Sequence, residues 1–228
     1  MKRKRSEKDL RAKKTQKHTP TNSSDTLSLP TENGCLSIDG ELPKELVDKY
    51  ALGGESFETL WSLQPKEPGK VLMYGKETIV PRWQQPYLND YHFSGMNHEA
   101  IPDIPDILKP LFDWVQDTIH AKDKDGPFNQ LLMNGYKNGH DYISAHSDNE
   151  TQLKKNSAIL SISLGETRVF RITGKDGSRV MDIPLEHGRV VTMKNEMQKM
   201  YKHAIVKVGG KKGEKLGRRI NITFRKFK

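Results

Sequence analysis

The chain has 228 residues, a formal net charge of +9 and a single cysteine, Cys35. This length suits one domain with a tail, and one cysteine excludes an internal disulfide and fits a reducing compartment. No apolar run approaches the roughly 18 residues that a membrane span needs, and none follows the basic N-terminus as in a signal peptide, so we expect neither a membrane protein nor a secreted one.

The positive charge is concentrated at the two ends of the chain. Residues 1–19 carry nine Lys and Arg against two acids, and residues 207–228 carry nine against Glu214 alone, which leaves a mildly acidic body. Residues 1–34 are rich in Lys, Arg, Ser, Thr and Pro, a composition that indicates disorder. Their basic clusters at 2–5 and 11–14 predict nuclear import, although a solvated tail has the same composition.

Residues 35–128 are expected to be mainly helical. The stretch 41–61 indicates two short helices separated by glycines at 53 and 54, and the apolar spacing from Ile107 to Ile119 indicates a third. Between them, "VLMYGKETIVPRW" contains two β-rich runs around Gly75, which predicts a hairpin.

From residue 129 onward the pattern changes to short strands between turn signals. Many short strands at this spacing indicate a sandwich or jelly roll. We therefore expect an α+β fold in which N-terminal helices support an antiparallel β-barrel. The predicted strands are "NQLLMNGY", "AILSISL", "RVFRIT", "RVMDIPL", "RVVTM", "HAIVKV" and "RINITFRKF".

A candidate metal site begins with the stretch "GHDYISAHSDNET". In an extended segment His146 and Asp148 face the same way, and two histidines with one carboxylate can hold a divalent metal, as in non-haem Fe(II) oxygenases. His203, in a predicted strand, supplies the second histidine. Both parts also have a simpler interpretation: His146 and Asp148 can form an ordinary surface pair, and His203 can be an ordinary histidine at the end of a strand. A zinc hydrolase can also use this ligand set.

The last predicted strand has one apolar and one polar face. A buried polar face is costly unless it binds something, and two arginines suit a dicarboxylate. An edge strand protected by charge is the alternative. Asn134 and Tyr136 share one face of another predicted strand. The apolar face has Ile220, Ile222 and Phe224, and the polar face has Arg219, Asn221, Thr223 and Arg225.

These motifs together resemble the AlkB family of Fe(II)/2-oxoglutarate dioxygenases, and in particular its nuclear DNA-repair members. The shared pieces are "NGY", "HSDNE", "SISLGETRVFRI", "IPLEHGRVV", "YKHAI" and "RINITFR", with "VLMYGK", "VPRW" and "YHFSG" upstream. They cover roughly residues 70–228. The resemblance implies a double-stranded β-helix at 129–228, within a dioxygenase domain spanning 35–228 whose first part, 35–128, holds helices and a nucleotide-recognition lid.

The resemblance also implies the ligands and cofactors of the site. Fe(II) would be held by His146, Asp148 and His203. The co-substrate 2-oxoglutarate would be held by Asn134, Tyr136, Arg219, Thr223 and Arg225, with Arg219 and Tyr136 at its distal carboxylate and Arg225 nearer the metal. Dioxygen is the other co-substrate.

The target base would lie between an aromatic pair and His146. Bases methylated on a ring nitrogen carry positive charge, which aromatic faces and a carboxylate attract, and they pair poorly, so they are easier to extrude. Relatives acting on duplex DNA often have an acid where this chain has Asn149. The implied substrate residues are Tyr91 and Phe93 as the aromatic pair, Tyr74 as a finger that fills the gap left by the base, and Gly75, Lys76, His92, Asn149 and Glu150.

The implied function is oxidative demethylation of 1-methyladenine and 3-methylcytosine in DNA, with release of formaldehyde, succinate and CO2. We expect a nuclear monomer that acts on methylated DNA, including duplex DNA. Two alternatives remain open, an RNA demethylase of the same family and a non-catalytic jelly roll that binds nucleic acid through its basic ends.

Overall fold

The computed structural model describes residues 36–73, 75–93, 95–118 and 126–228. The predictions made for residues 1–34, Cys35 and Tyr74 lie outside these ranges. The elements of the first half are β1 (Leu36–Glu41), α1 (Lys44–Lys49), α2 (Glu55–Ser62), β2 (Lys70–Met73), β3 (Lys76–Ile79), β4 (Trp83–Tyr87), β5 (Tyr91–Phe93), β6 (Met96–His98), η1 (Asp106–Leu108) and α3 (Lys109–Thr118).

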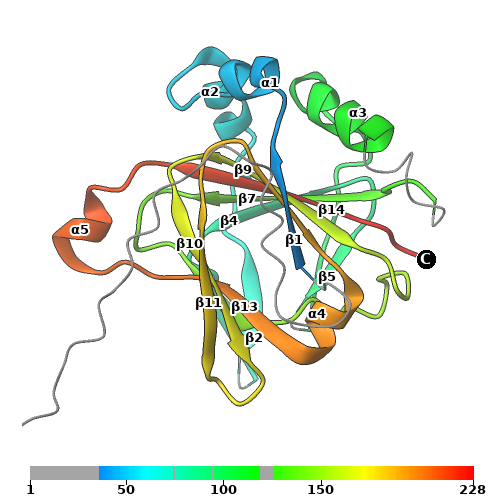
Figure 1. The fold of residues 1–228 in the computed structure, drawn as a ribbon, viewed down its shortest axis with the longest axis vertical. Coiled ribbons are helices and arrows are strands. Elements are labelled where there is room, and N and C mark those ends of the chain that lie inside the picture. The colour runs from blue at the N-terminus through cyan, green and yellow to red at the C-terminus, as the bar shows by residue number, and fades with distance from the viewer. Residues whose placement is uncertain (1–35, 74, 94, 119–125) are drawn as a thin grey trace, which may run out of the picture.

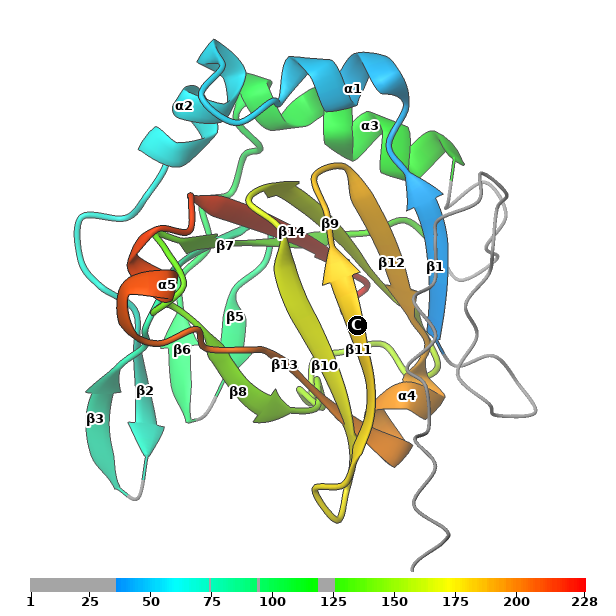
Figure 2. The same cartoon turned by 60° about the vertical axis from the view of Figure 1, so that its left-hand side comes forward.

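The second half is dominated by strands. Figures 1 and 2 show these strands packed below the three N-terminal helices, with α5 projecting at one edge. The elements are β7 (Gln130–Tyr136), β8 (Ile143–His146), β9 (Ile159–Gly165), β10 (Arg168–Gly174), β11 (Arg179–Leu185), β12 (Arg189–Met193), α4 (Asn195–Met200), β13 (Tyr201–Ile205), α5 (Gly210–Glu214) and β14 (Arg219–Arg225).

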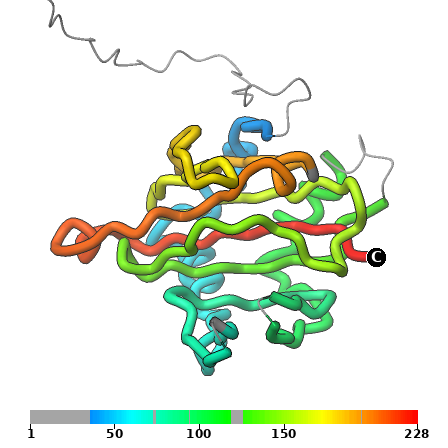
Figure 3. The backbone as a smooth tube through the Cα atoms, turned by 90° about the horizontal axis from the view of Figure 1, so that it is seen from below, coloured from blue at the N-terminus to red at the C-terminus, as the bar shows by residue number. Residues whose placement is uncertain are grey.

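Two antiparallel sheets form the body of the protein. The larger has six strands in the order β1-β12-β9-β14-β7-β4, and the smaller has four in the order β11-β10-β13-β8. Residues far apart in sequence are therefore neighbours, and in Figure 3 the red final strand runs through the middle of the molecule with strands on both sides. This arrangement confirms the predicted α+β class and its jelly-roll core.

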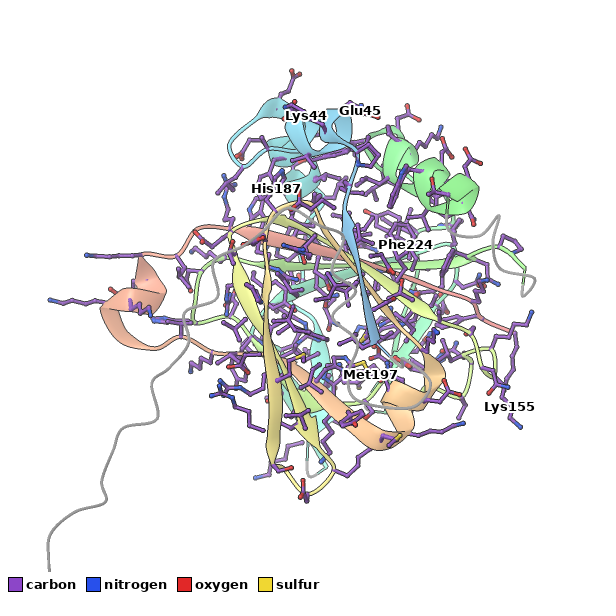
Figure 4. All side chains as sticks on the ribbon, viewed as in Figure 1. Lys44, Glu45, Lys155, His187, Met197 and Phe224 are labelled. Carbon is purple, nitrogen blue, oxygen red and sulfur yellow. The ribbon has the colours of Figure 1, made fainter. Side chains whose placement is uncertain are left out.

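The helices cover the outer face of the large sheet. Ile220, Ile222 and Phe224 of β14 are fully buried there, in a core that also contains residues of α2 and α3. Phe224 contacts Phe112 of α3 with ring centroids 6.4 Å apart, and Figure 4 shows Phe224 beneath that helix. His187 joins α1 to the sheet, because its Nε2 lies 2.9 Å from the carbonyl oxygen of Val47.

A second apolar core lies between the two sheets. It contains residues of both, including Tyr136 of β7, Ile172 of β10 and Met193 of β12, and it is closed at one end by Met197 of α4. The inward face of β14 borders this core, so the polar side chains of that strand lie inside the protein rather than at a solvent-exposed edge.

The N-terminal half differs from the predicted helical support in two places. β1 pairs with β12 at one edge of the large sheet, and β4 pairs with β7 at the other edge. The five residues of β4 are all buried, so this strand lacks the alternation of exposed and buried residues by which a strand is recognised. The two helices, the hairpin β2–β3 and α3 lie where they were predicted.

The seven predicted C-terminal strands are all present, with small differences. β13 starts at Tyr201 and ends at Ile205, and α4 separates it from β12. The glycine-lysine stretch near residue 210 contains the short helix α5. Among the described residues, no helix has the length and apolar character required to cross a bilayer.

Candidate functional site

The two candidate histidine ligands lie opposite each other on neighbouring strands. β13 pairs with β8 in a register that places His203 beside His146. Asp148 follows two residues after the end of β8. One ligand atom from each of these three residues lies within 4.8 Å of the other two. The Nε2 atom of His146 is 3.4 Å from one carboxylate oxygen of Asp148, and that of His203 is 3.9 Å from the other.

Local contacts prepare these side chains as ligands. The Nδ1 atom of His146 lies 2.9 Å from the carbonyl oxygen of Ser144, a contact that orients the ring with Nε2 on the side of Asp148. Burial, together with the nearby His146, lowers the pKa of His203 to about 3. His203 is therefore neutral near pH 7, as a metal ligand must be.

Asp148 stays ionised despite its burial. Burial opposes its ionisation, but the charge of Arg225 and the hydrogen bond with His146 outweigh burial and hold the pKa of Asp148 well below its ordinary value. Two imidazoles and one carboxylate on one side of a cavity are the donor set that suits Fe(II) with open positions for further ligands. The residues present thus fit an iron ion.

The polar face of β14 contains buried donors that lack partners. Arg219 is 1% exposed and donates from Nη2 to the hydroxyl oxygen of Ser163 at 2.9 Å. Its Nε and Nη1 atoms are buried without a hydrogen-bond partner among the described residues. Burial lowers the pKa of Arg219 to about 10, so the guanidinium remains charged at neutral pH. Unpaired N–H groups on a buried cation fit an incoming carboxylate.

Tyr136 lies beside Arg219, as the resemblance implied. Their Cα atoms are register partners in the pairing of β14 with β7, and the guanidinium lies 5.0 Å from the centre of the Tyr136 ring. At the other end of the strand, Arg225 lies 3.6 Å from a carboxylate oxygen of Asp148 and donates to the hydroxyl of Thr223 at 2.9 Å. The face therefore runs from Arg219 to the candidate metal ligands.

Asn134 is oriented by two residues that the sequence analysis missed. Arg82 and Gln84 both donate to its side-chain oxygen, at 2.9 and 3.3 Å. Because that oxygen is occupied as an acceptor, the amide nitrogen of Asn134 remains to donate to a ligand. Arg82 and Gln84 belong to "PRWQQPY", whose polar residues at alternate positions were the available signal.

One partly open cavity joins these groups. Its wall combines the candidate iron ligands, the polar face of β14 and apolar residues of the smaller sheet. The lining residues are Arg82, Gln84, Tyr91, Leu132, Asn134, Tyr136, Ile143, His146, Asp148, Ser161, Phe170, Leu185, Met193, His203, Ile205, Arg219, Asn221, Thr223 and Arg225.

The two residues of the predicted aromatic pair pack against each other in this structure. Tyr91 and Phe93 stack with ring centroids 5.9 Å apart, and Tyr91 lies beneath the guanidinium of Arg225. Phe93 meets His146 edge to face, with centroids 6.1 Å apart. Phe93 and His146 thus contact each other directly in this structure, and the sandwich of a base between the aromatic pair and His146 stays a prediction.

Glu150 is a buried carboxylate that lacks a strong partner. Burial, reinforced by the negative charge of Asp148, raises its pKa. Tyr91 lies close enough to affect that pKa, but neither carboxylate oxygen accepts a well-formed hydrogen bond from the described residues. A positively charged ring is the kind of ligand that this position attracts.

The remaining predicted substrate residues lie at the surface, outside the cavity lining. They are exposed residues of the two hairpins and of the segment that follows β8. The structure therefore does not bring them into the site. They are Gly75, Lys76, His92 and Asn149.

Comparison with known proteins identifies relatives over most of the described chain. The family model described as the 2OG-Fe(II) oxygenase superfamily matches residues 66–225. The human protein named DNA oxidative demethylase ALKBH2 is 34% identical over 169 residues, which cover 69% of this chain and 61% of that protein. Human alpha-ketoglutarate-dependent dioxygenase alkB homolog 3 is 31% identical over 159 residues, covering 63% of this chain and 52% of that protein.

A solved structure also shares the fold. The protein in "The structure of OsALKBH1" superposes with a TM-score of 0.50 at 17% identity, covering 80% of this chain and 93% of that one. At this identity the likeness concerns the fold alone. The matched part of this chain spans between 57% and 66% of the length of the mammalian ALKBH2 proteins.

Proposed function

The chain belongs to the 2OG-Fe(II) oxygenase superfamily, and we propose that it removes methyl groups oxidatively from ring nitrogens of bases in DNA. The predicted AlkB resemblance is confirmed, as are the dioxygenase class and the use of Fe(II), 2-oxoglutarate and O2. The individual substrate residues and the preferred lesion stay predictions.

One observation carries the choice of a positively charged base. Glu150 is a buried carboxylate without a well-formed hydrogen bond from the described residues, and it lies two positions from Asp148 and beside the stacked ring of Tyr91. A flat cation such as 3-methylcytosine or 1-methyladenine satisfies both the carboxylate and the aromatic faces. A neutral base gains less from the same groups.

His146, Asp148 and His203 would hold Fe(II), and the positive charge of Arg225 keeps Asp148 ionised. The metal with 2-oxoglutarate and O2 would supply the oxidation that hydroxylates the N-methyl group, giving formaldehyde, succinate and CO2. Arg219 would hold the distal carboxylate of 2-oxoglutarate through its unpartnered N–H groups, which would fix the position of the co-substrate relative to the metal.

Surface features support DNA as the substrate. The hairpin β2–β3 exposes Leu72 and Ile79, and it contacts the hairpin β5–β6 next to β8 in Figure 2. Exposed apolar side chains of a hairpin can pack against bases next to a flipped nucleotide. The exposed Lys207, Lys211 and Lys212 around α5 form a basic patch that suits phosphates.

Formaldehyde release is the test of this function. Oligonucleotides that contain 1-methyladenine or 3-methylcytosine are supplied as duplex DNA, single-stranded DNA and RNA, with Fe(II) and 2-oxoglutarate. We expect release from DNA by the wild-type protein and none from His146→Ala. Faster release from RNA would reassign the substrate, and neither formaldehyde nor succinate with any oligonucleotide would refute the demethylase.

A pair of substrates with similar shape but different charge tests the role of Glu150. Glu150→Gln should lower kcat/KM by about tenfold on cationic 3-methylcytosine, because a hydrogen bond or ion pair with a charged group contributes about 1.5–3 kcal/mol. On neutral 3-methylthymine the loss should be small. Equal losses on the two substrates would show that Glu150 does not respond to the charge of the base.

The basic clusters at residues 2–5 and 11–14 support a nuclear location as part of the same proposal. A fluorescent fusion should accumulate in the nucleus, and replacing the basic residues of both clusters with alanine should disperse it. Unchanged accumulation would refute these clusters as the import signal.

A further inference from the structure

A set of hydrogen bonds lies behind the candidate iron ligands, on α4 and on the turn after β10. Gln198 of α4 is 6% exposed, and its side-chain oxygen accepts a hydrogen bond from the backbone N–H of Asp148 at 2.9 Å. Asp148 lies beyond the end of β8, so the β8–β13 ladder does not hold its backbone. Gln198 therefore replaces a missing ladder contact at the ligand itself.

The residue between the two ligands of the same segment is held as well. The hydroxyl of Ser147 donates to the carbonyl oxygen of Tyr201 at 2.7 Å. Tyr201 opens β13, the strand that carries His203 two residues later. This bond ties the segment that carries His146 and Asp148 to the strand that carries the third ligand.

Lys175 joins these two contacts. Its ammonium donates to the hydroxyl oxygen of Ser147 at 2.6 Å and to the backbone carbonyl of Gln198 at 2.9 Å. Lys175 directly follows β10, and Figure 2 shows the start of β13 beside α4. Three separate elements, α4, the turn after β10 and the start of β13, thus meet at the segment that carries His146 and Asp148.

Such a network changes the cost of binding a metal. A loop that is ordered only when the metal arrives loses conformational freedom at that moment, which weakens binding. Two imidazoles and a carboxylate directed at one point also need support from their surroundings when no cation is present. If the loop is already ordered in the folded protein, metal binding causes no further loss of conformational freedom, and the ligand side chains are already supported.

We infer that Gln198 and Lys175 are positioning residues that hold the His146-Ser147-Asp148 segment in its metal-binding arrangement before the metal binds. The inference rests on the use of iron in the proposed function but not on the nucleic-acid substrate. The sign of the Lys175 effect is informative. Removing a positive charge near the site should by itself strengthen the binding of a cation. Weaker metal binding without Lys175 would therefore indicate the loss of the hydrogen bonds that hold the segment.

The test is the affinity of the metal-free protein for Mn(II) alone, measured by calorimetry. Gln198→Met removes the acceptor at similar volume and should weaken Mn(II) binding about 10- to 100-fold, the usual effect of losing a contact that orients a ligand. Gln198→Glu keeps an acceptor oxygen and should restore the affinity. Lys175→Met should weaken binding several-fold, and the exposed Lys199→Met on the same helix is the matched control, without effect.

Three outcomes would overturn the inference. The first is that Gln198→Met binds Mn(II) as tightly as the wild-type protein. If that variant fails to fold, Ser147→Ala is measured instead, and an unchanged Mn(II) affinity would refute the positioning role of the network. Lys175→Met with unchanged Mn(II) affinity but a higher KM for DNA would identify Lys175 as a phosphate contact instead. Because Mn(II) binding needs no oligonucleotide, a failed demethylation assay leaves this result standing on its own.

Discussion

The two faces of β14 are buried to a similar degree, yet they differ in how their side chains are satisfied. On the helix side, Ile220, Ile222 and Phe224 pack fully into an apolar core. On the inner side, Arg219 and Arg225 are 1% and 3% exposed, and each leaves at least one buried N–H without a partner among the described residues.

This difference separates stability from binding within a single strand. The apolar face gains free energy of folding from burial, at about 25 cal/mol per Å² of apolar surface. The inner face loses free energy because buried donors stay unpaired. We infer that the unpaired donors are kept for a ligand. Replacing an inner-face residue should therefore weaken ligand binding and spare stability, and replacing an apolar residue should lower stability and spare binding.

Arg219→Met should give the largest effect on binding. Hydrogen bonds to charged groups contribute about 1.5–3 kcal/mol each, and tenfold in affinity corresponds to about 1.4 kcal/mol, so losing two should raise the KM for 2-oxoglutarate by about 100-fold or more. Steady-state succinate formation measures it. The thermal stability of the protein should stay equal or rise, because an unsatisfied buried charge is removed.

Arg218→Met is the matched control for that change. Arg218 precedes Arg219 but pairs with Glu58 at the surface, outside the cavity lining. Its replacement should leave the KM for 2-oxoglutarate unchanged. An equal rise in KM for both variants would show that the two arginines do not have separate roles.

Ile222→Ala should show the reverse pattern. Truncating a fully buried isoleucine costs about 2–5 kcal/mol of unfolding free energy, because it removes apolar contacts and leaves a cavity. Urea unfolding of the metal-free protein measures this loss. The KM for 2-oxoglutarate should stay within about threefold of wild type, because the hydrogen-bonding side chains of the opposite face are not altered. A large rise in KM would mean that the two faces are not independent.

Thr223→Val should give a smaller effect on both properties. The hydroxyl of Thr223 accepts from Arg225 at 2.9 Å and donates to the carbonyl oxygen of Leu132 at 3.2 Å. Losing the bond from the charged Arg225, of about 1.5–3 kcal/mol, should raise the KM for 2-oxoglutarate by about tenfold, and losing the neutral bond to Leu132, of about 0.5–1.5 kcal/mol, should lower stability by about 1 kcal/mol. Calorimetric binding and urea unfolding test it, and no change in either would show that Thr223 does not orient Arg225.

Replacing Asp182 on β11 should change stability least, because its ion pair with Arg171 is accessible to solvent. The hydrogen bond with Arg171 lowers the pKa of Asp182 below its ordinary value of 3.8. Its stabilisation is therefore present above about pH 4 and is lost as the pH falls further. Asp182→Asn should remove this acid-dependent part of stability, seen in thermal unfolding, without altering the KM for 2-oxoglutarate. An altered KM would contradict the separation.

The sequence allowed both faces of β14 to be predicted, because a strand repeats every two residues and "RINITFR" alternates between polar and apolar residues from end to end. The same rule failed at β4, where "WQQPY" is buried on both sides and the pattern of exposed and buried positions disappears. Arg82, just before β4, and Gln84 do alternate with Trp83, but the polar Gln85 follows directly and interrupts that signal.

Contacts between distant elements could not be read from the sequence. The contact of Phe93 with His146 joins β5 to β8, and the bond from Asp148 to Gln198 joins a backbone group to a side chain 50 residues away. Neither contact has a periodic signature. The polar face of β14 was therefore predictable from the sequence. The contact between the hairpin β5–β6 and His146, and the hydrogen bonds around Asp148, could be found only in the structure.

The most direct test of the account measures whether the inner face of β14 and the metal triad form one ligand site. Calorimetry of 2-oxoglutarate with Mn(II)-loaded protein should show one molecule bound per chain. That binding should weaken strongly without Mn(II) and equally strongly in Arg219→Met. Binding that is independent of both the metal and Arg219 would contradict the account.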